Sequence, residues 1–154
     1  MINNRELRIG NYIFVDDIRR KICCIKNDDD TLQSPCIGFE QNSDCEYEIV
    51  DSDRVRAIPI SDELLRDLGF VFHDYFKLWQ RKQPKKAYTI ELDSEYSALD
   101  FSHRPIVRDM EYLHQLQNLF FSVQGEELFF LDGNAGPGRS YTLPVQEMNE
   151  TNER

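Results

Sequence analysis

Cysteines and histidines are the residues of this chain whose chemistry is easiest to recognise. The four cysteines, Cys23, Cys24, Cys36 and Cys45, all lie near the beginning of the sequence. Zinc sites built from thiolates use closely spaced pairs, whereas here two adjacent cysteines are followed by gaps of 11 and then 8 residues. We therefore predict reduced thiols, no bound metal and no other cofactor.

No arrangement of nucleophile and base is evident. His73, His103 and His114 fall on three different predicted elements, and none belongs to an HExxH pattern that would place two ligands on one helix face. A GxSxG elbow is also missing. The sequence therefore favours a non-catalytic protein over an enzyme, and leaves open an enzyme without a recognisable motif.

Two polar stretches look like binding loops but lack the full patterns. The three aspartates at 28–30 are not followed by the alternating oxygens and central glycine of a calcium loop. The stretch GNAGPGRS at 133–140 has neither the lysine nor the following helix of a phosphate loop. We interpret the first as a solvated turn and the second as linker.

A run of mixed cations and aromatic rings at 75–88, YFKLWQRKQPKKAY, is the most suggestive surface feature. Aromatic stacking combined with cations is how proteins hold single-stranded nucleic acid without reading its sequence. A hairpin with inward-facing rings and lysines around Pro84 explains the same pattern, and the net charge favours that interpretation. The residues of the nucleic-acid alternative are Lys77, Trp79, Arg81, Lys82, Lys85 and Lys86.

The charge balance works against phosphate-backbone binding. The formal net charge is −10 and the pI is near 4.7. Residues 1–60 carry 8 basic and 12 acidic side chains, 61–109 carry 8 and 9, and 110–154 carry 2 and 7. We therefore expect a protein partner rather than nucleic acid, although clustered carboxylates that imitate a nucleic acid are a related possibility.

We predict a cytoplasmic protein with no membrane contact. No apolar leader segment follows Met1, and no run approaches the roughly 18 apolar residues of a membrane helix.

Residues 112–131, YLHQLQNLFFSVQGEELFFL, are predicted to form an amphipathic helix, a glycine stop and a strand. Apolar residues recur at three- and four-residue steps up to Val123, Gly125 is placed to end the helix, and 128–131 is strongly apolar. The polar side of the helix is dense in amides. It could bind a partner, form an ordinary solvent-facing stripe or cap neighbouring backbone. The partner-binding candidates are His114, Gln115, Gln117 and Asn118.

Residues 1–60 are predicted to form a small antiparallel SH3-like β-barrel or bent sheet. Five short runs typical of strands, at 6–15, 18–25, 35–40, 45–50 and 55–60, are separated by polar turns. Gly10 and Asn11 mark a bend in the first run, Asp16 and Asp17 a hairpin turn. We expect a single 3₁₀ turn at 51–54, by analogy with such barrels.

Residues 61–131 are predicted to form an α+β subdomain, so the fold class is α+β. Ser61 is a good N-cap for a short helix that ends at Gly69, and three strand-like runs follow at 70–79, 87–92 and 96–101. Asp109 is a plausible N-cap of the long helix. Residues 132–154, rich in glycine at their start, are predicted to be a flexible tail.

Three sequence blocks resemble a family of short uncharacterised proteins found in gut Bacteroides-type bacteria and in their phages and mobile elements. The blocks are ELRIGN at 6–11, IPIS followed by LL and LGF at 58–70, and HQLQNLFF with GEEL at 114–128. No catalytic residue is implied by this resemblance. Residues 70–108 and the tail match no block. Together with the charge and motif arguments, the resemblance leads us to expect a protein-interaction module of phage or mobile-element type. It leaves the partner and the oligomeric state open.

Overall fold

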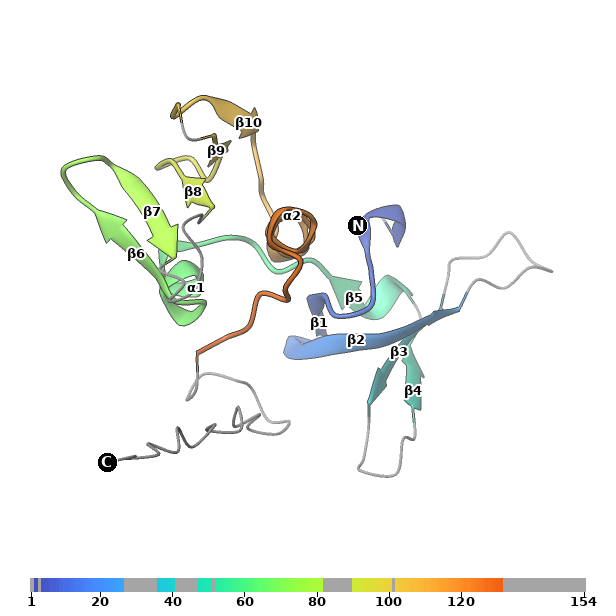
Figure 1. Ribbon diagram of the computed structural model, residues 1–154. Coiled ribbons are helices and arrows are strands. Elements are labelled where there is room, and N and C mark those ends of the chain that lie inside the picture. The colour runs from blue at the N-terminus through green and yellow to red at the C-terminus, as the bar shows by residue number, and fades with distance from the viewer. Residues whose placement is uncertain are drawn as a thin grey trace, which may run out of the picture.

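The computed structural model describes residues 2, 4–26, 36–40, 47–50, 52–81, 90–100 and 102–131. Two five-stranded antiparallel sheets and two α-helices make up these residues, so the predicted α+β class is confirmed. The first sheet comes from the N-terminal part of the chain and the second from the middle, and the long helix lies between them (Figure 1).

The first sheet has the strand order β4-β3-β2-β1-β5. Its elements are η1 (Asn4–Glu6), β1 (Tyr12–Val15), β2 (Ile18–Lys26), β3 (Cys36–Glu40), β4 (Tyr47–Val50), the 3₁₀ turn η2 (Ser52–Arg54) and β5 (Val55–Arg56). The register of β2 against β3 shifts between Ile22 and Cys24, and such a bulge bends a strand. Since β4 and β5 end the described strand order, we describe this sheet as bent and open.

Local turn signals were read correctly in this sheet. Asp16 and Asp17 join β1 to β2 with φ values of 47° and 66°, and the predicted 3₁₀ turn is η2. The first strand is shorter than predicted, however, because it begins at Tyr12 rather than at residue 6. Gly10, with φ of 98°, turns the chain just before it.

The second sheet follows the short helix α1 (Asp62–Asp67). Ser61 caps this helix as predicted, its Oγ accepting a hydrogen bond from the Leu64 N–H at 3.2 Å. Five strands follow where three were predicted, and the aromatic run at 70–79 proves to be a hairpin. The strands are β6 (Phe70–His73), β7 (Leu78–Arg81), β8 (Glu91–Leu92), β9 (Ala98–Leu99) and β10 (Pro105–Val107), in the order β10-β9-β8-β7-β6.

The long helix α2 (Leu113–Gln124) lies where the sequence predicted it, but its N-cap differs from the predicted one. Its N-cap is Tyr112 and not Asp109, because the preceding chain runs extended against 58–60: the Ile60 N–H donates to the Glu111 carbonyl, and the Leu113 N–H donates to the Ile58 carbonyl. Gly125 ends the helix as predicted, with φ of 70°.

The predicted final strand at 128–131 is not formed. Leu128 and Phe130 are buried while Phe129 and Leu131 are exposed, which is the alternation of a strand, but this segment joins neither described sheet. Instead, the Leu131 N–H donates to the Asp67 carbonyl at 2.8 Å.

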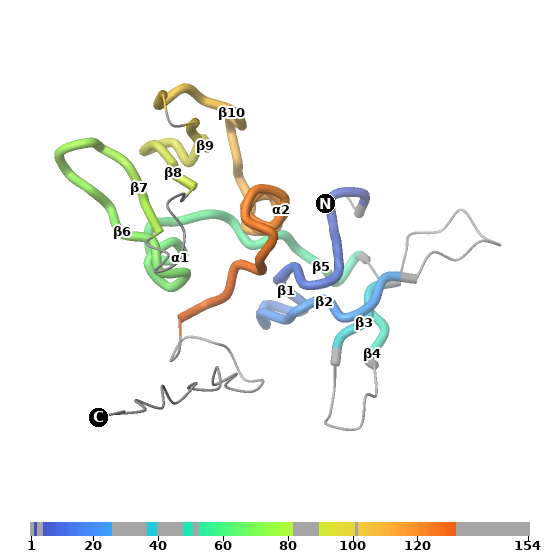
Figure 2. The backbone as a smooth tube through the Cα atoms, viewed as in Figure 1, coloured from blue at the N-terminus to red at the C-terminus, as the bar shows by residue number. Residues whose placement is uncertain are grey.

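Two clusters of buried apolar residues form the core. The larger combines α1, α2, the second sheet and residues 128–130, and the smaller lies within the first sheet. Tyr12 and Phe14, on β1 of the first sheet, pack against the larger cluster. Figure 2 shows β1, a strand of the first sheet, close to α2. No helix in the described parts of the chain is long and apolar enough to cross a membrane.

Candidate functional site

The polar side of α2 faces the chain's own N-terminal segment 6–12, which we call the N-terminal strap. Gln117 is fully buried, with 0% of its surface exposed. Its Oε1 accepts a hydrogen bond from the Tyr12 N–H at 2.9 Å, and its Nε2 donates to the Gly10 carbonyl at 3.4 Å. The Gln117 side chain thereby provides hydrogen-bond partners for two backbone groups that would otherwise be buried without them.

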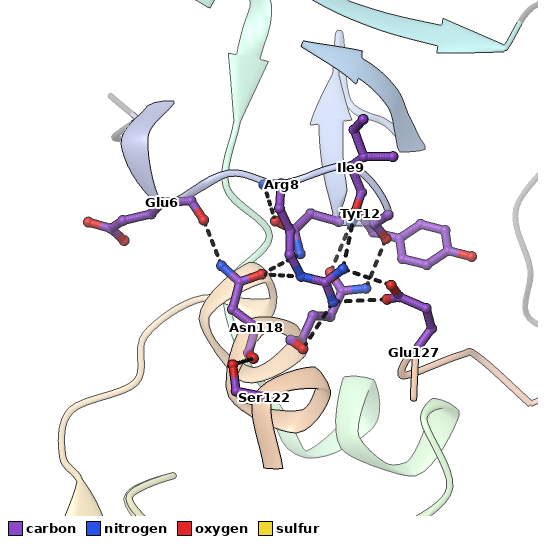
Figure 3. A network of polar contacts seen from close by, with 10 residues as sticks. Glu6, Arg8, Ile9, Tyr12, Asn118, Ser122 and Glu127 are labelled. Carbon is purple, nitrogen blue, oxygen red and sulfur yellow. Dashed lines mark hydrogen bonds and ion pairs between the residues drawn. The ribbon is translucent and has the colours of Figure 1, made fainter. Parts of the chain in front are cut away.

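Asn118 makes a second set of contacts with the strap (Figure 3). Its Oδ1 accepts hydrogen bonds from Arg8 Nε at 2.8 Å and from Asn11 Nδ2 at 2.9 Å. Its Nδ2 donates to the Glu6 carbonyl at 2.6 Å. Asn11 is itself fully buried. Both ends of the Asn118 amide are therefore occupied within the chain.

Arg8 connects the strap to the segment that follows α2. Its Nη1 and Nη2 donate to the two carboxylate oxygens of Glu127 at 2.7 and 2.9 Å, and Nη2 also reaches the Gln117 carbonyl at 3.3 Å. The guanidinium lies 4.4 Å from the centre of the Phe121 ring. Hydrogen bonds from Arg8 hold the pKa of Glu127 below its ordinary value, against the opposing effect of burial. This paired geometry is the strong form of an arginine–carboxylate contact.

His114 and Gln115 face the start of the strap and the start of the helix. Gln115 Oε1 accepts from the N–H groups of Glu111 and Tyr112 at 2.9 and 3.1 Å, and its Nε2 lies 3.4 Å from Glu6 Oε2. His114 is 1% exposed, with Nε2 also 3.4 Å from Glu6 Oε2. Its Nδ1 is buried and has no hydrogen-bond partner among the described residues. Burial lowers the pKa of His114, although Glu6 opposes this.

The four predicted partner-binding residues thus lie together, but they contact the chain itself. The expectation of a solvent-facing stripe is wrong for His114 and Gln117, which are buried. The alternative that the amides bind neighbouring backbone describes Gln115, Gln117 and Asn118. Their partners Arg8, Asn11 and Glu127 were not identified from sequence.

The contacts also join the three sequence blocks. ELRIGN supplies Arg8, HQLQNLFF supplies Asn118, and GEEL supplies Glu127. The IPIS block joins them through the larger apolar cluster, which contains Ile58 together with Leu116 and Leu128. The blocks therefore lie next to one another in space. Pairing the charged and amide residues of different blocks could have predicted these contacts from the sequence.

The basic and aromatic run at 75–88 is divided by the fold. Trp79 is 2% exposed and packs on Phe72, so its ring faces the core. Arg81 Nε donates to the Leu68 carbonyl at 2.8 Å with its guanidinium 5.4 Å from the Phe120 ring, and burial lowers its pKa. Lys77 is 70% exposed. Lys82, Lys85 and Lys86 lie outside the described residues.

Two aromatic side chains are exposed at the turn between β6 and β7. Tyr75 is 88% exposed and Phe76 is 63% exposed, and their rings meet edge to face with centroids 4.9 Å apart. Lys77, which closes the turn, has φ of 55°, and its N–H donates to the His73 carbonyl. We call Tyr75 and Phe76 the aromatic tip.

An open hollow of about 460 Å³ lies beside the aromatic tip. Its apolar walls are formed by Phe76, Leu78, Leu99 and Pro105, and its polar lining by Lys77, Asp93, Ser94 and His103. The hollow therefore combines parts of the β6–β7 turn with the strands and turns from β8 to β10.

Two similar turns hold the far side of the hollow. Asp93 Oδ1 accepts from the N–H groups of Glu95 and Ser97, both at 2.9 Å, and the Ser97 carbonyl accepts from the Asp93 N–H. Asp100 repeats the arrangement with Ser102 and Arg104, at 2.8 and 2.9 Å. Side-chain oxygens that bind backbone two residues ahead stabilise such turns, so the hollow has a defined wall.

Metal ligands are not clustered in the described parts of the chain, where no group of three or more histidine, cysteine or acidic side chains could hold an ion. Cys23 and Cys24 are free thiols, half-buried on β2. Cys45 lies outside the described residues.

Comparison with protein-family models, with curated proteins and with solved structures gives no match to this chain.

Proposed function

We propose that this chain is a non-catalytic protein-interaction module that binds another protein through the aromatic tip and the adjoining hollow. The observation that carries the proposal is the exposure of Tyr75 and Phe76, at 88% and 63%, beside an open hollow with apolar and polar walls. Large exposed apolar groups next to one another mark interaction sites, and aromatic residues dominate the energetics of protein interfaces.

The form of the hollow supports a protein partner over a small molecule. Small-molecule sites enclose most of the ligand surface. Here the hollow is open to solvent, and apolar side chains such as Leu78 and Leu99 line it together with polar ones such as Lys77 and Ser94. Protein–protein interfaces likewise combine apolar and polar side chains.

The nucleic-acid alternative receives less support. Stacking of bases requires an accessible ring, and Trp79 is buried against Phe72. Arg81 is engaged with the Leu68 carbonyl. Among the described candidates of that alternative, Lys77 alone has a mostly exposed side chain. A titration with single-stranded oligonucleotide at low salt distinguishes the two, and we expect no saturable binding.

The resemblance of the three blocks supports a role in a Bacteroides-type bacterium, with the gene carried by a phage or mobile element and the protein acting in the cytoplasm. The partner sought is accordingly a host or phage protein. Lysate of such a bacterium is the suitable source for the binding experiment.

The test compares the proteins retained by immobilised wild type, by the double variant Tyr75→Ser, Phe76→Ser and by the control Ile49→Ser. Ile49 is an exposed apolar residue of β4, 47% exposed, on the other sheet. We expect one or more proteins to be retained saturably by wild type and control and lost with the double variant. Equal retention by all three would contradict the proposed binding surface.

A further inference from the structure

We propose that the aromatic tip and the hollow bind a basic segment of the partner protein, with an arginine of that segment stacked on the exposed rings and near the carboxylates around the hollow. This inference rests on the proposed function, because it concerns the same surface. It adds the chemistry by which the partner is recognised.

Two partly exposed phenylalanine rings elsewhere in this chain are each contacted by one of its own cations. The Arg8 guanidinium lies 4.4 Å from the centre of the Phe121 ring, and Lys21 Nζ lies 5.5 Å from the centre of the Phe129 ring. The two phenylalanines are 43% and 47% exposed. The face of an aromatic ring attracts a cation that lies within about 6 Å of its centre. In this chain, partly exposed rings thus bind cations.

The two rings of the aromatic tip are more exposed, and no cation of the described residues lies over either of them. The adjacent Lys77 lies instead 6.0 Å from the centre of the Phe72 ring, and its Nζ is 3.9 Å from Asp74 Oδ1. Because Tyr75 and Phe76 meet edge to face, their contact covers one face of one ring only. Tyr75 and Phe76 therefore present ring faces to a cation from another protein.

The described surroundings of the tip and hollow are acidic. Residues 74–78, 91–100 and 102–105 contain five acidic side chains and two basic ones, which gives 2 − 5 = −3 with histidine counted as neutral. Both basic side chains already pair with a neighbouring carboxylate, at 3.9 and 3.8 Å. The three other carboxylates are those of Glu91, Asp93 and Glu95. Charge of this sign attracts a basic partner and repels an acidic one.

Asp93 places one of these carboxylates in the lining of the hollow. Its Oδ1 accepts hydrogen bonds from the N–H groups of Glu95 and Ser97, both at 2.9 Å, so the turn fixes its position. An ionised carboxylate has about four acceptor sites on its two oxygens, and Asp93 therefore keeps capacity for a cation. A carboxylate that is already fixed loses little conformational entropy when it binds.

Arginine is the side chain that fits both parts of this surface. Its planar guanidinium stacks on aromatic faces, and its N–H donors match the geometry of a carboxylate. Its methylene groups can lie against apolar surface, which Leu78 and Leu99 supply in the hollow.

Three capped peptides of glycine and leucine, which differ only in carrying two arginines, two citrullines or two glutamates, test this chemistry. Citrulline keeps the shape of arginine without its charge. Binding to the full-length chain is followed by amide NMR at low salt. We expect the arginine peptide to shift the signals of Tyr75, Phe76 and Leu99 saturably, the citrulline peptide to bind roughly threefold more weakly, and the glutamate peptide to cause no shift. Equal binding of the arginine and citrulline peptides overturns the proposal, as does an arginine peptide that causes no saturable shift at these amides.

Variants show whether the arginine peptide uses the rings and the carboxylate. Tyr75→Ser, Phe76→Ser keeps every charge and should weaken binding roughly fivefold. Asp93→Asn keeps the oxygen that holds the turn but removes the charge, and should weaken binding roughly twofold. Asp53→Asn, at an exposed carboxylate of η2, is the matched control and should leave the affinity unchanged. If the double variant bound as tightly as wild type, or if both aspartate variants lost equal affinity, the net charge of the protein would explain the binding and the proposal would fail.

Failure here is separable from failure of the proposed function. If wild type does not prefer the arginine peptide, but its lysate partner is still lost with the double variant, the binding surface stands and the basic partner is refuted. If the lysate partner is retained equally by wild type and the double variant, the proposed function itself is contradicted.

Discussion

At the scale of single residues, the surroundings of an ion pair decide its contribution. Arg8 and Glu127 are 26% and 27% exposed, and Arg8 also bonds Asn118 and contacts the Phe121 ring. Arg54 and Asp16 form a comparable pair at 48% and 53% exposure. Exposed pairs are screened by solvent and contribute little, while hydrogen bonds to partly buried charges contribute more.

We expect Arg8→Ala to lower the free energy of unfolding by about 1–3 kcal/mol, because the strap loses its bonds to α2 and to Glu127. Arg54→Ala is the matched control and should cause a much smaller change. Urea unfolding followed by the fluorescence of Trp79, the single tryptophan, measures both. Equal losses for the two variants would contradict the role given to Arg8.

His114 should make stability depend on pH near neutrality. Burial lowers its pKa in the folded protein below the ordinary value of 6.5, so the unfolded chain takes up the proton first. The free energy of unfolding should therefore fall as the pH drops from about 6.5 to the folded pKa, and then level off. His114→Gln should flatten this part of the profile, as measured by urea unfolding at a series of pH values.

Glu127 acts at a lower pH. Because Arg8 holds its folded pKa below the ordinary 4.5, its contribution is present above that value and is lost as the pH falls through the folded pKa. Glu127→Gln should remove the contribution of Glu127 to the loss of stability in acid and leave the change near neutrality, assigned to His114, in place. If this variant changed the acidic and the near-neutral parts of the stability profile equally, the assignment of the acidic part to Glu127 would be incorrect.

At the scale of elements, a buried amide on α2 fixes the start of β1 in the first sheet. Gln117→Leu keeps a similar volume but leaves the Tyr12 N–H without its acceptor. We expect a loss of about 1–3 kcal/mol and faster hydrogen exchange at the Tyr12 amide. Ser122→Ala, on the exposed side of the same helix, is the control and should leave that amide protected.

The end of α2 offers a separate test of backbone strain. Gly125 has φ of 70°, and a Cβ there would meet no atom within 4 Å, so the cost of a side chain comes from the backbone alone. Gly125→Ala should lower the free energy of unfolding by about 1–2 kcal/mol. Gly125→Asn should cost less, since asparagine tolerates this conformation better. Thermal or urea unfolding of both variants shows whether backbone strain or side-chain packing causes the loss of stability.

Sequence predicted the local features of the fold and missed those set by distant contacts. Ser61, the Asp16–Asp17 turn and Gly125 act through neighbouring backbone, and each was identified correctly. The buried face of α2 was predicted in part: Leu113, Leu116 and Phe120 are buried as expected, but Val123 is 52% exposed. The burial of Gln117 was not predicted. Apolar periodicity predicts that Val123 is buried. The burial of Gln117 is explained only by hydrogen-bond partners more than 100 residues away in the sequence.

The candidate site was predicted in part for the same reason. The run at 75–88 does include Phe76, Lys77 and Leu78 of the hollow, but Leu99 and Pro105 come from other strands and His103 from the turn between them. The sequence pattern did not show that the chain reverses direction after His73. It therefore did not distinguish the buried Trp79 from the exposed Tyr75. The pairing of β6 with β7 determines which rings are buried.

At the scale of the whole molecule, α2 joins two apolar cores. Its apolar side belongs to the larger core, its polar side holds the strap, and the strap leads into β1 of the smaller core. Tyr12 and Phe14 extend the packing across the junction. We therefore expect the two sheets to unfold together, while the aromatic tip, distant from the strap, is left free for binding.

The most direct test compares unfolding in the two cores. Trp79 fluorescence reports the larger core, and hydrogen exchange at the Ile22 amide, which donates to the Asn11 carbonyl at 2.8 Å, reports the first sheet. We predict the same free energy of unfolding from both probes, and an equal reduction of both by Asn118→Ala. The account would be contradicted if the Ile22 amide exchanged through a local opening with a lower free energy than global unfolding, and if Asn118→Ala left that free energy unchanged.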